Sequence, residues 1–292
     1  MSRLLGIAVF FSVVTSWGNN LLVSSFDIAA LQRYAHASSL SYLSMEKMQT
    51  SEYLSLSRLE PLLQVIDPES ESGATIFKDN SSGNNIKRLI VACRGSANPK
   101  NFGTNLKFKL TPATKLSQPT PAGAMVHEGF QDASLGLWKE LAQPLLSRIK
   151  EEKDVNEIIF TGHSLGAANA LLTSVHYRTS MPSSSSLSSP SIVTFGGPKL
   201  CNSILARYIR NDALEDCSIL HLVHDKDPVL ANNQKLWSDL GFVDVGIELQ
   251  CDPNSPEVHT AAEDRPKSFF SSFAWNILDH CNYMGVYIGP RA

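Results

Sequence analysis

The hydrophobic positions of the chain form two kinds of pattern, short continuous runs and stripes with helical spacing. Continuous apolar runs bounded by turn formers are typical of buried strands, and stripes with a period near 3.6 residues are typical of amphipathic helices. The runs predict strands over residues 74–77, 89–93, 155–160, 192–195 and 219–223. The stripes predict helices over residues 27–45, 129–150 and 164–177, the second of them broken or bent near Pro144 because proline lacks a backbone N–H.

The order of these predicted elements indicates an α/β protein. A turn-forming stretch over residues 80–85 joins the first two strands, which predicts a hairpin, and from there strands alternate with helices. Such alternation is typical of a mostly parallel central sheet with helices on both faces. The Ser-rich stretch 183–191 predicts a solvated loop. No long linker divides the chain, so we expect one catalytic domain over residues 19–292.

The N-terminus has the pattern of a secretory signal peptide. Arg3 precedes an apolar run over residues 4–14, and Ser16 and Gly18 supply small residues near a cleavage point. We therefore expect residues 1–18 to be a signal peptide, and the protein to be secreted or to reach the lumen of the endomembrane system. The alternative is association with a membrane through an uncleaved N-terminal segment. A glycosylation sequon at Asn80 agrees with the secretory route.

Composition narrows the class of partner. The chain has 292 residues, of which 43% are hydrophobic, and its formal net charge is −3. It carries no basic stripe of the kind that follows a phosphate backbone, so no nucleic acid partner is expected. A neutral, hydrophobic or lipid-like substrate suits this small net charge and the absence of a basic stripe.

The number of cysteines does not fit a fully paired disulfide framework. Their number, five, is odd, so at least one is expected to remain unpaired within the chain. Cys93 is the candidate for the unpaired thiol because its predicted strand is central and apolar. Cys201 and Cys217 could pair, while the pairing of Cys251 and Cys281 stays open. No spacing matches a zinc site.

The segment 162–166 carries the strongest chemical signal. It has the sequence Gly-His-Ser-Leu-Gly between a predicted strand and a predicted helix, which is the context of the G-x-S-x-G nucleophile elbow. The glycines permit a tight, strained turn that lifts the hydroxyl of Ser164 above the sheet, at the N-terminus of a helix. We therefore expect Ser164 to be the nucleophile of a serine hydrolase. The alternative is a serine that only caps the helix.

A serine nucleophile needs a histidine base and a carboxylate, which follow it in the order acid, then histidine. Asp227 follows the predicted strand 219–223, and we favour it over Asp225 because Pro228 stiffens its loop. His280 is the preferred base because it lies near the C-terminus, as the order demands. His259, in a polar loop, is the alternative.

The oxyanion hole and a lid are expected at the same edge of the sheet as the elbow, where the parallel strands end. Ser96 follows the strand 89–93, so its N–H, with that of Leu165, could stabilise an oxyanion. Residues 97–108 mix apolar and polar side chains, and with the Pro-containing stretch up to residue 124 they suit a mobile lid that meets a lipid surface. The alternative is an ordinary surface loop.

Taken together, the motifs resemble those of the class 3 lipase family, which includes fungal triacylglycerol lipases and plant and algal acylhydrolases. The matching residues occur in family order from about residue 29 onward. They are Arg94, Gly95 and Ser96 followed by Asn101, Phe102, Asn105, Leu106 and Phe108; Val126 to Phe130; Gly162 to Gly166; Val193 to Pro198; Asp227, Pro228 and Val229; and Leu278, Asp279 and His280 with Tyr283.

The resemblance implies an α/β-hydrolase fold with a short lid after Ser96. It also implies a Ser164, Asp227 and His280 triad and an oxyanion hole formed by Ser96 and the amide of Leu165. It implies no metal, no organic cofactor and no obligate protein partner. The implied partner is a lipid ester at an interface, with peripheral contact to a membrane or lipid droplet through the lid.

Four positions depart from the family pattern. Phe102 stands where a lid tryptophan is frequent, and Asn105 stands where an aspartate is usual. Ala167 replaces a third glycine after the elbow, and Leu230 replaces a proline that often follows the acid loop. None of these changes removes a catalytic group, but Asn105 cannot supply a charged partner near the oxyanion serine.

Three functional hypotheses result. The first is a lipase that hydrolyses acylglycerols or related lipid esters through an acyl-enzyme. The second is a feruloyl-type esterase, or another esterase of soluble substrates, because the fold and triad do not determine the leaving group. The third is a catalytically silent, lipase-like binding module.

Overall fold

The computed structural model describes residues 27–81, 87–96, 109–181, 185, 187, 189–227, 230, 237–260 and 277–290. The expected signal peptide, the first part of the expected lid (residues 97–108) and much of the Ser-rich stretch lie outside the described residues. So do the departures from the family pattern at Phe102 and Asn105.

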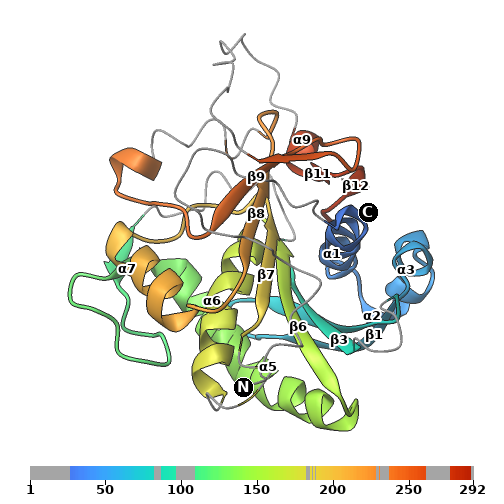
Figure 1. The fold of residues 1–292 in the computed structure, drawn as a ribbon, viewed down its shortest axis with the longest axis horizontal. Coiled ribbons are helices and arrows are strands. Elements are labelled where there is room, and N and C mark those ends of the chain that lie inside the picture. The colour runs from blue at the N-terminus through green and yellow to red at the C-terminus, as the bar shows by residue number, and fades with distance from the viewer. Residues whose placement is uncertain are drawn as a thin grey trace, which may run out of the picture.

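Within the described residues, a large central sheet dominates the molecule (Figure 1). Its strands follow the order β1-β2-β3-β6-β7-β8-β9-β10. The strands β3, β6, β7, β8 and β9 run parallel, whereas β1, β2 and β10 join antiparallel. The bounds are β1 Leu59–Ile66, β2 Gly73–Asp79, β3 Lys87–Cys93, β6 Val155–His163, β7 Ser191–Phe195, β8 Ile219–Val223, β9 Ile247–Cys251 and β10 Val258–Thr260.

All five predicted strands are confirmed, and so are the hairpin of β2 and β3 and the mostly parallel sheet. The patterning missed β1, β9 and β10. It also missed two small two-stranded sheets, formed by β4 (Leu110–Pro112) with β5 (Met125–His127) and by β11 (Asn282–Tyr283) with β12 (Val286–Tyr287). Strands this short hold too few residues for a periodic signal.

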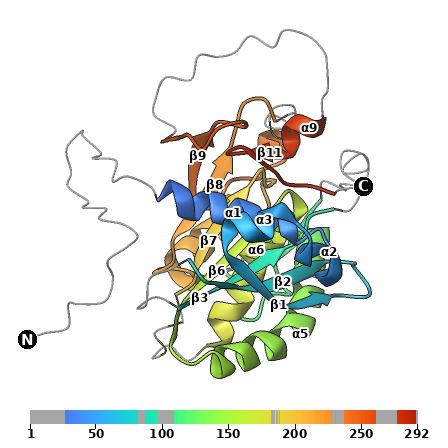
Figure 2. The same cartoon turned by 90° about the vertical axis from the view of Figure 1, so that its right-hand side faces the viewer.

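Helices cover both faces of the sheet, as predicted (Figures 1 and 2). On one face α1 (Ile28–Leu40) packs against alternate residues of the strands, such as Ile90 and Ile159. On the other face α5 (Glu128–Glu151) and α6 (Leu165–Ser180) pack against the intervening residues, such as Val91 and Phe160. The other helical segments are α2 (Met45–Gln49), α3 (Glu52–Ser57), α7 (Ser203–Tyr208), η2 (Ile209–Ala213) and α9 (Ile277–His280).

Two helix predictions need correction. The helix predicted over residues 27–45 ends at Leu40, and α2 starts separately because Ser44 caps it by accepting a hydrogen bond from the N–H of Lys47. The helix predicted to be broken or bent near Pro144 has no break, because α5 continues through this residue; a bend there stays a prediction. Buried Leu141 and Leu145 anchor this part of α5 in the core, which offsets the missing backbone hydrogen bond.

The cysteines form no disulfide, since all five carry free thiols. The prediction for Cys93 is confirmed, while the possible bridge between Cys201 and Cys217 is wrong. Burial raises the pKa of both of these thiols to about 12, so they remain protonated at neutral pH. In the part of the chain that the structure describes, no helix combines the length and apolar character needed to cross a membrane.

Candidate active site

The turn between β6 and α6 holds Ser164 in an unusual backbone conformation. Its φ of 59° and ψ of −126° lie in a region that L-residues rarely adopt. The turn is held in place because the N–H of Ser164 donates to the carbonyl of Phe195 at 3.0 Å and its own carbonyl accepts from Ala167 at 2.9 Å. This is the strained geometry expected of a nucleophile elbow.

The two glycines of the elbow leave no room for a side chain. A Cβ at Gly162 would lie 2.5 Å from the carbonyl carbon of Gly166 and would overlap its oxygen. A Cβ at Gly166 would lie 2.8 Å from the carbonyl carbon of Arg94 and 2.9 Å from the N of Gly95. The start of α6 therefore packs directly against the backbone that follows β3.

The close approach of Gly166 to Gly95 involves the neighbours of the two predicted oxyanion donors. Ser96 is half-buried and comes directly after Gly95, while Leu165 directly precedes Gly166. The assignment of their N–H groups as oxyanion donors stays a prediction.

Asp227, the predicted acid, lies in the loop after β8 with its side chain completely buried. Its Oδ2 accepts hydrogen bonds from His280 Nδ1 at 2.8 Å and from the hydroxyl of Tyr283 at 2.5 Å. Burial alone would raise the pKa of Asp227, but His280 and Tyr283 outweigh this effect and lower it to about 2. Asp225, the less favoured candidate, is exposed.

The backbone of the acid loop also contributes to this carboxylate. The N–H of Leu230 donates to Asp227 Oδ1 at 3.3 Å. A proline at this position would have no N–H, so the leucine that departs from the family pattern adds a hydrogen bond to the acid.

His280, the predicted base, lies at the end of α9 and is buried. Its backbone carbonyl accepts a 2.7 Å hydrogen bond from Nε2 of His163, and the two imidazole rings lie 4.6 Å apart between centroids. His163 directly precedes Ser164, so this bond connects the backbone of the expected base to the residue beside the expected nucleophile. His259, the alternative base, lies in β10 rather than in a loop, and its backbone pairs with Gln250.

The other histidines after Ser164 have different environments. His221 bonds the hydroxyl of Thr194 at 2.8 Å and the carbonyl of Gly197 at 3.1 Å, so both ring nitrogens are engaged. His176 bonds Ser117 through Nδ1, and burial lowers the pKa of His176 to about 4. Neither ring is paired with a carboxylate in the way that His280 is.

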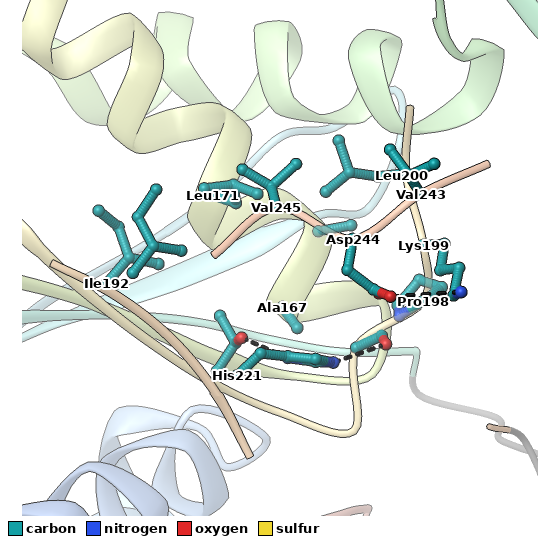
Figure 3. A pocket seen from close by; sticks show the side chains of 14 residues that line it. Ala167, Leu171, Ile192, Pro198, Lys199, Leu200, His221, Val243, Asp244 and Val245 are labelled. Atoms are coloured by element: carbon teal, nitrogen blue, oxygen red, sulfur yellow. Dashed lines mark hydrogen bonds and ion pairs between the residues drawn. The ribbon is translucent and has the colours of Figure 1, made fainter. Parts of the chain in front are cut away.

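Figure 3 shows a small pocket lined by residues of α6, β7 and β8 and of the segments 197–200 and 243–245. Apolar side chains such as Ala167, Leu171 and Val245 line it, together with an ion pair between Lys199 and Asp244 at 3.3 Å. Its described lining includes none of the predicted site residues. The bonds of His221 to Thr194 and Gly197 stabilise the turn after β7, beside this pocket.

Sequence reasoning assigned no role to several residues around the triad, among them Tyr283 and His163. Tyr283 belongs to the C-terminal motif but was assigned no role, although a tyrosine three positions after the base could have suggested one. His163 occupies a position of the elbow that the motif leaves variable, so no local signal marked it. Among the described residues, no group of histidine, cysteine and acidic side chains could hold a metal ion.

Comparisons with known proteins show which family this chain is similar to. The family model described as Lipase (class 3) matches residues 90–232. A lipase of Rhizomucor miehei is 29% identical over 213 residues, which cover 71% of this chain and 54% of that protein. A secreted mono- and diacylglycerol lipase of Fusarium solani is 27% identical over 169 residues, which cover 56% of this chain and 44% of that protein. The chain spans about half the length of these curated relatives.

The fold also matches a solved structure. The triacylglyceride lipase of Rhizomucor miehei superposes with a TM-score of 0.70 at 24% identity, over 91% of this chain and 97% of that one. The predicted α/β-hydrolase fold is therefore confirmed.

Proposed function

We propose that this chain, which matches the class 3 lipase model over residues 90–232, hydrolyses carboxylic esters of lipids with Ser164, His280 and Asp227 as its triad. The observation that carries this proposal is the 2.8 Å bond between His280 and Asp227. These residues are 53 positions apart in the sequence, yet they meet, and the backbone of His280 bonds His163, the neighbour of the strained Ser164.

In the proposed reaction, Ser164 Oγ attacks the ester carbonyl carbon while Nε2 of His280 accepts the hydroxyl proton. The N–H groups of Ser96 and Leu165 stabilise the resulting oxyanion. Collapse of the tetrahedral intermediate breaks the bond to the alcohol, which leaves with the proton from His280. A water molecule, activated by the same imidazole, then releases the carboxylic acid and restores Ser164.

Asp227 stabilises the charged form of the base in this scheme. Its pKa of about 2 keeps it ionised at neutral pH, so it accepts the Nδ1–H of His280 and holds Nε2 ready to take the proton from Ser164. Neither the formation of the acyl-enzyme nor its hydrolysis requires a cofactor or a metal in this scheme.

We propose acylglycerols or related lipid esters, met at an interface, as the substrates. The relatives named above support this class, and so does Leu278, which is 51% exposed two residues from the base. The segment 97–108, with Phe102, Leu106 and Phe108, is the proposed lid and contact to a membrane or droplet surface. A panel of emulsified esters with different head groups measures the preference among them.

A fluorophosphonate probe tests the assignment of the nucleophile. The probe should label the wild-type protein and fail to label Ser164→Ala, which should also lose all measurable ester hydrolysis. Ser180→Ala, at the other end of α6, is the matched control and should be labelled like the wild type. Labelling of Ser164→Ala would overturn the assignment, and a folded wild type without labelling or turnover would favour the binding module.

The physical state of the substrate separates the two esterase hypotheses. A lipase should gain activity when a short-chain ester passes from monomers into micelles or an emulsion. Activity that follows only the monomer concentration would instead support an esterase of soluble substrates.

We also propose that residues 1–18 are removed during secretion and that residues 19–292 form one catalytic domain. The sequence of the N-terminus and the secreted relative of Fusarium solani support this proposal. Expression of the full chain in a eukaryotic secretory host, followed by N-terminal sequencing of the protein from the medium, is the test. A product that stays in the cell with an intact leader would contradict it.

A further inference from the structure

A hydrogen-bonded chain links three parts of the active site that lie far apart in the sequence. The hydroxyl of Tyr42, in the turn after α1, lies 3.0 Å from Nδ1 of His163. Nε2 of the same imidazole lies 2.7 Å from the backbone carbonyl of His280. The Tyr42 hydroxyl also lies directly against Gly95, where a Cβ would overlap it.

The direction of each bond follows from the donors available. A carbonyl oxygen can only accept, so Nε2 of His163 must carry the proton. Burial, with the charge of His280 second, lowers the pKa of His163 to about 3, so the ring is neutral and its Nδ1 is an acceptor. The hydroxyl of Tyr42 therefore donates to Nδ1, and desolvation raises the pKa of Tyr42, which keeps this proton in place.

The Tyr42 hydroxyl also occupies space that the surrounding backbone leaves free. A Cβ at Gly95 would overlap the hydroxyl and would lie 2.6 Å from the carbonyl oxygen of His163. The glycine before the oxyanion serine is therefore required for the approach of this tyrosine. The hydroxyl fits between the end of β3 and the elbow.

We propose that Tyr42 is a positioning residue that holds the oxyanion serine, the nucleophile and the base in one arrangement. Its hydroxyl lies against Gly95, which precedes Ser96, and bonds His163, which precedes Ser164. The same imidazole bonds the backbone carbonyl of His280. Small displacements of reacting groups lower the rate of the chemical step strongly. This inference rests on the proposed function, because it concerns how the same triad is aligned.

Tyr42→Phe removes only the hydroxyl and is the principal test. With a short monomeric ester, we expect kcat to fall about 10- to 100-fold while KM changes by less than about twofold, because alignment rather than binding is lost. Inactivation by the fluorophosphonate should slow by a similar factor. In the proton NMR spectrum, the downfield signal of the hydrogen bond between His280 and Asp227 should shift or broaden.

Tyr34→Phe is the matched control, since Tyr34 lies buried in the preceding helix and its hydroxyl has no hydrogen-bond partner among the described residues. It should keep the kcat and the NMR signal of the wild type. An unchanged kcat in Tyr42→Phe would overturn the proposal. An equal fall in both variants would also overturn it, because the loss would then reflect general packing.

A second pair of variants decides the question if Tyr42→Phe fails to fold. His163→Gln keeps an N–H donor for the carbonyl of His280, whereas His163→Leu does not. We expect His163→Gln to retain at least about 10-fold more kcat than His163→Leu. Equal losses of kcat in the two variants would contradict a role for the hydrogen bond from His163 to the carbonyl of His280. A wild type without turnover or labelling would instead overturn the proposed function, and the NMR comparison would still test the alignment.

Discussion

At the scale of the residue, strain marks Ser164 more clearly than its sequence motif does. Arg58 also has a positive φ, but its φ of 55° and ψ of 30° place it in the ordinary left-handed region. The ψ of −126° at Ser164 lies far outside that region. Such a conformation persists only when neighbouring contacts enforce it, and it is common at functional sites.

Tyr283 offers a prediction at this scale. Tyr283→Phe removes a hydroxyl bonded to the ionised Asp227, so the free energy of unfolding should fall by about 1.5–3 kcal/mol. The kcat for ester hydrolysis should fall about tenfold, because the acid then depends on fewer donors to keep its orientation. Urea unfolding and initial rates with a soluble ester measure the two effects.

Tyr177→Phe is the control for this experiment. The hydroxyl of Tyr177 donates to the neutral carbonyl of Leu187 at 2.9 Å, away from the triad. Its loss should cost about 0.5–1.5 kcal/mol of stability and leave kcat unchanged. If Tyr283→Phe kept the kcat of the wild type as well, Tyr283 would have no part in orienting the acid.

At the scale of the element, two glycines in the first turns of helices allow a direct comparison. In α6 a Cβ at Gly166 would overlap the carbonyl oxygen of Cys93, whose strand cannot move away. In α5 a Cβ at Gly129 would meet only His127, at an ordinary 3.5 Å. The same substitution should therefore have opposite effects in the two helices.

Gly166→Ala should lower the free energy of unfolding by about 1–3 kcal/mol or more, because the elbow must shift away from β3. Gly129→Ala should raise it by roughly 0.5–1 kcal/mol, since alanine loses less conformational freedom on folding. Thermal unfolding of both variants measures the difference. Equal destabilisation would show that contact with β3 is not what excludes a side chain at Gly166.

At the scale of the whole molecule, buried histidines couple stability to pH. Burial lowers the pKa of His163 to about 3 and that of His176 to about 4, and it also lowers the pKa of His221 and His224. In the unfolded chain a histidine has a pKa of about 6.5. Below this pH the unfolded state binds protons that the folded state does not, so stability falls as pH decreases.

The free energy of unfolding should therefore decrease as pH falls from about 6.5 toward about 4, by up to about 1.4 kcal/mol per pH unit for each such histidine. Asp227 adds a further loss only below about pH 4, where its carboxylate begins to be protonated in the unfolded state. Urea unfolding at several pH values measures the slope. His176→Gln, remote from the triad, should reduce it, and an unchanged slope would contradict the assignment to buried neutral histidines.

By itself the sequence determined the features that depend on local pattern. Continuous apolar runs indicated the central strands, and the spacing within residues 162–166 indicated the elbow, because a tight strand-to-helix turn admits only certain residues. The order of Ser164, Asp227 and His280 along the chain was also visible. It could be interpreted because this fold restricts where an acid and a base can follow the elbow.

Only the tertiary structure decided which remote groups meet. The end of the helix predicted over residues 27–45 depended on a cap at Ser44, and the unpaired state of Cys201 and Cys217 depended on where the packed core placed them. The bonds of Tyr42 and Tyr283 depend on contacts between residues distant in the sequence. Such contacts leave no periodic signal, because they are set by the packing of whole elements rather than by the neighbours of each residue.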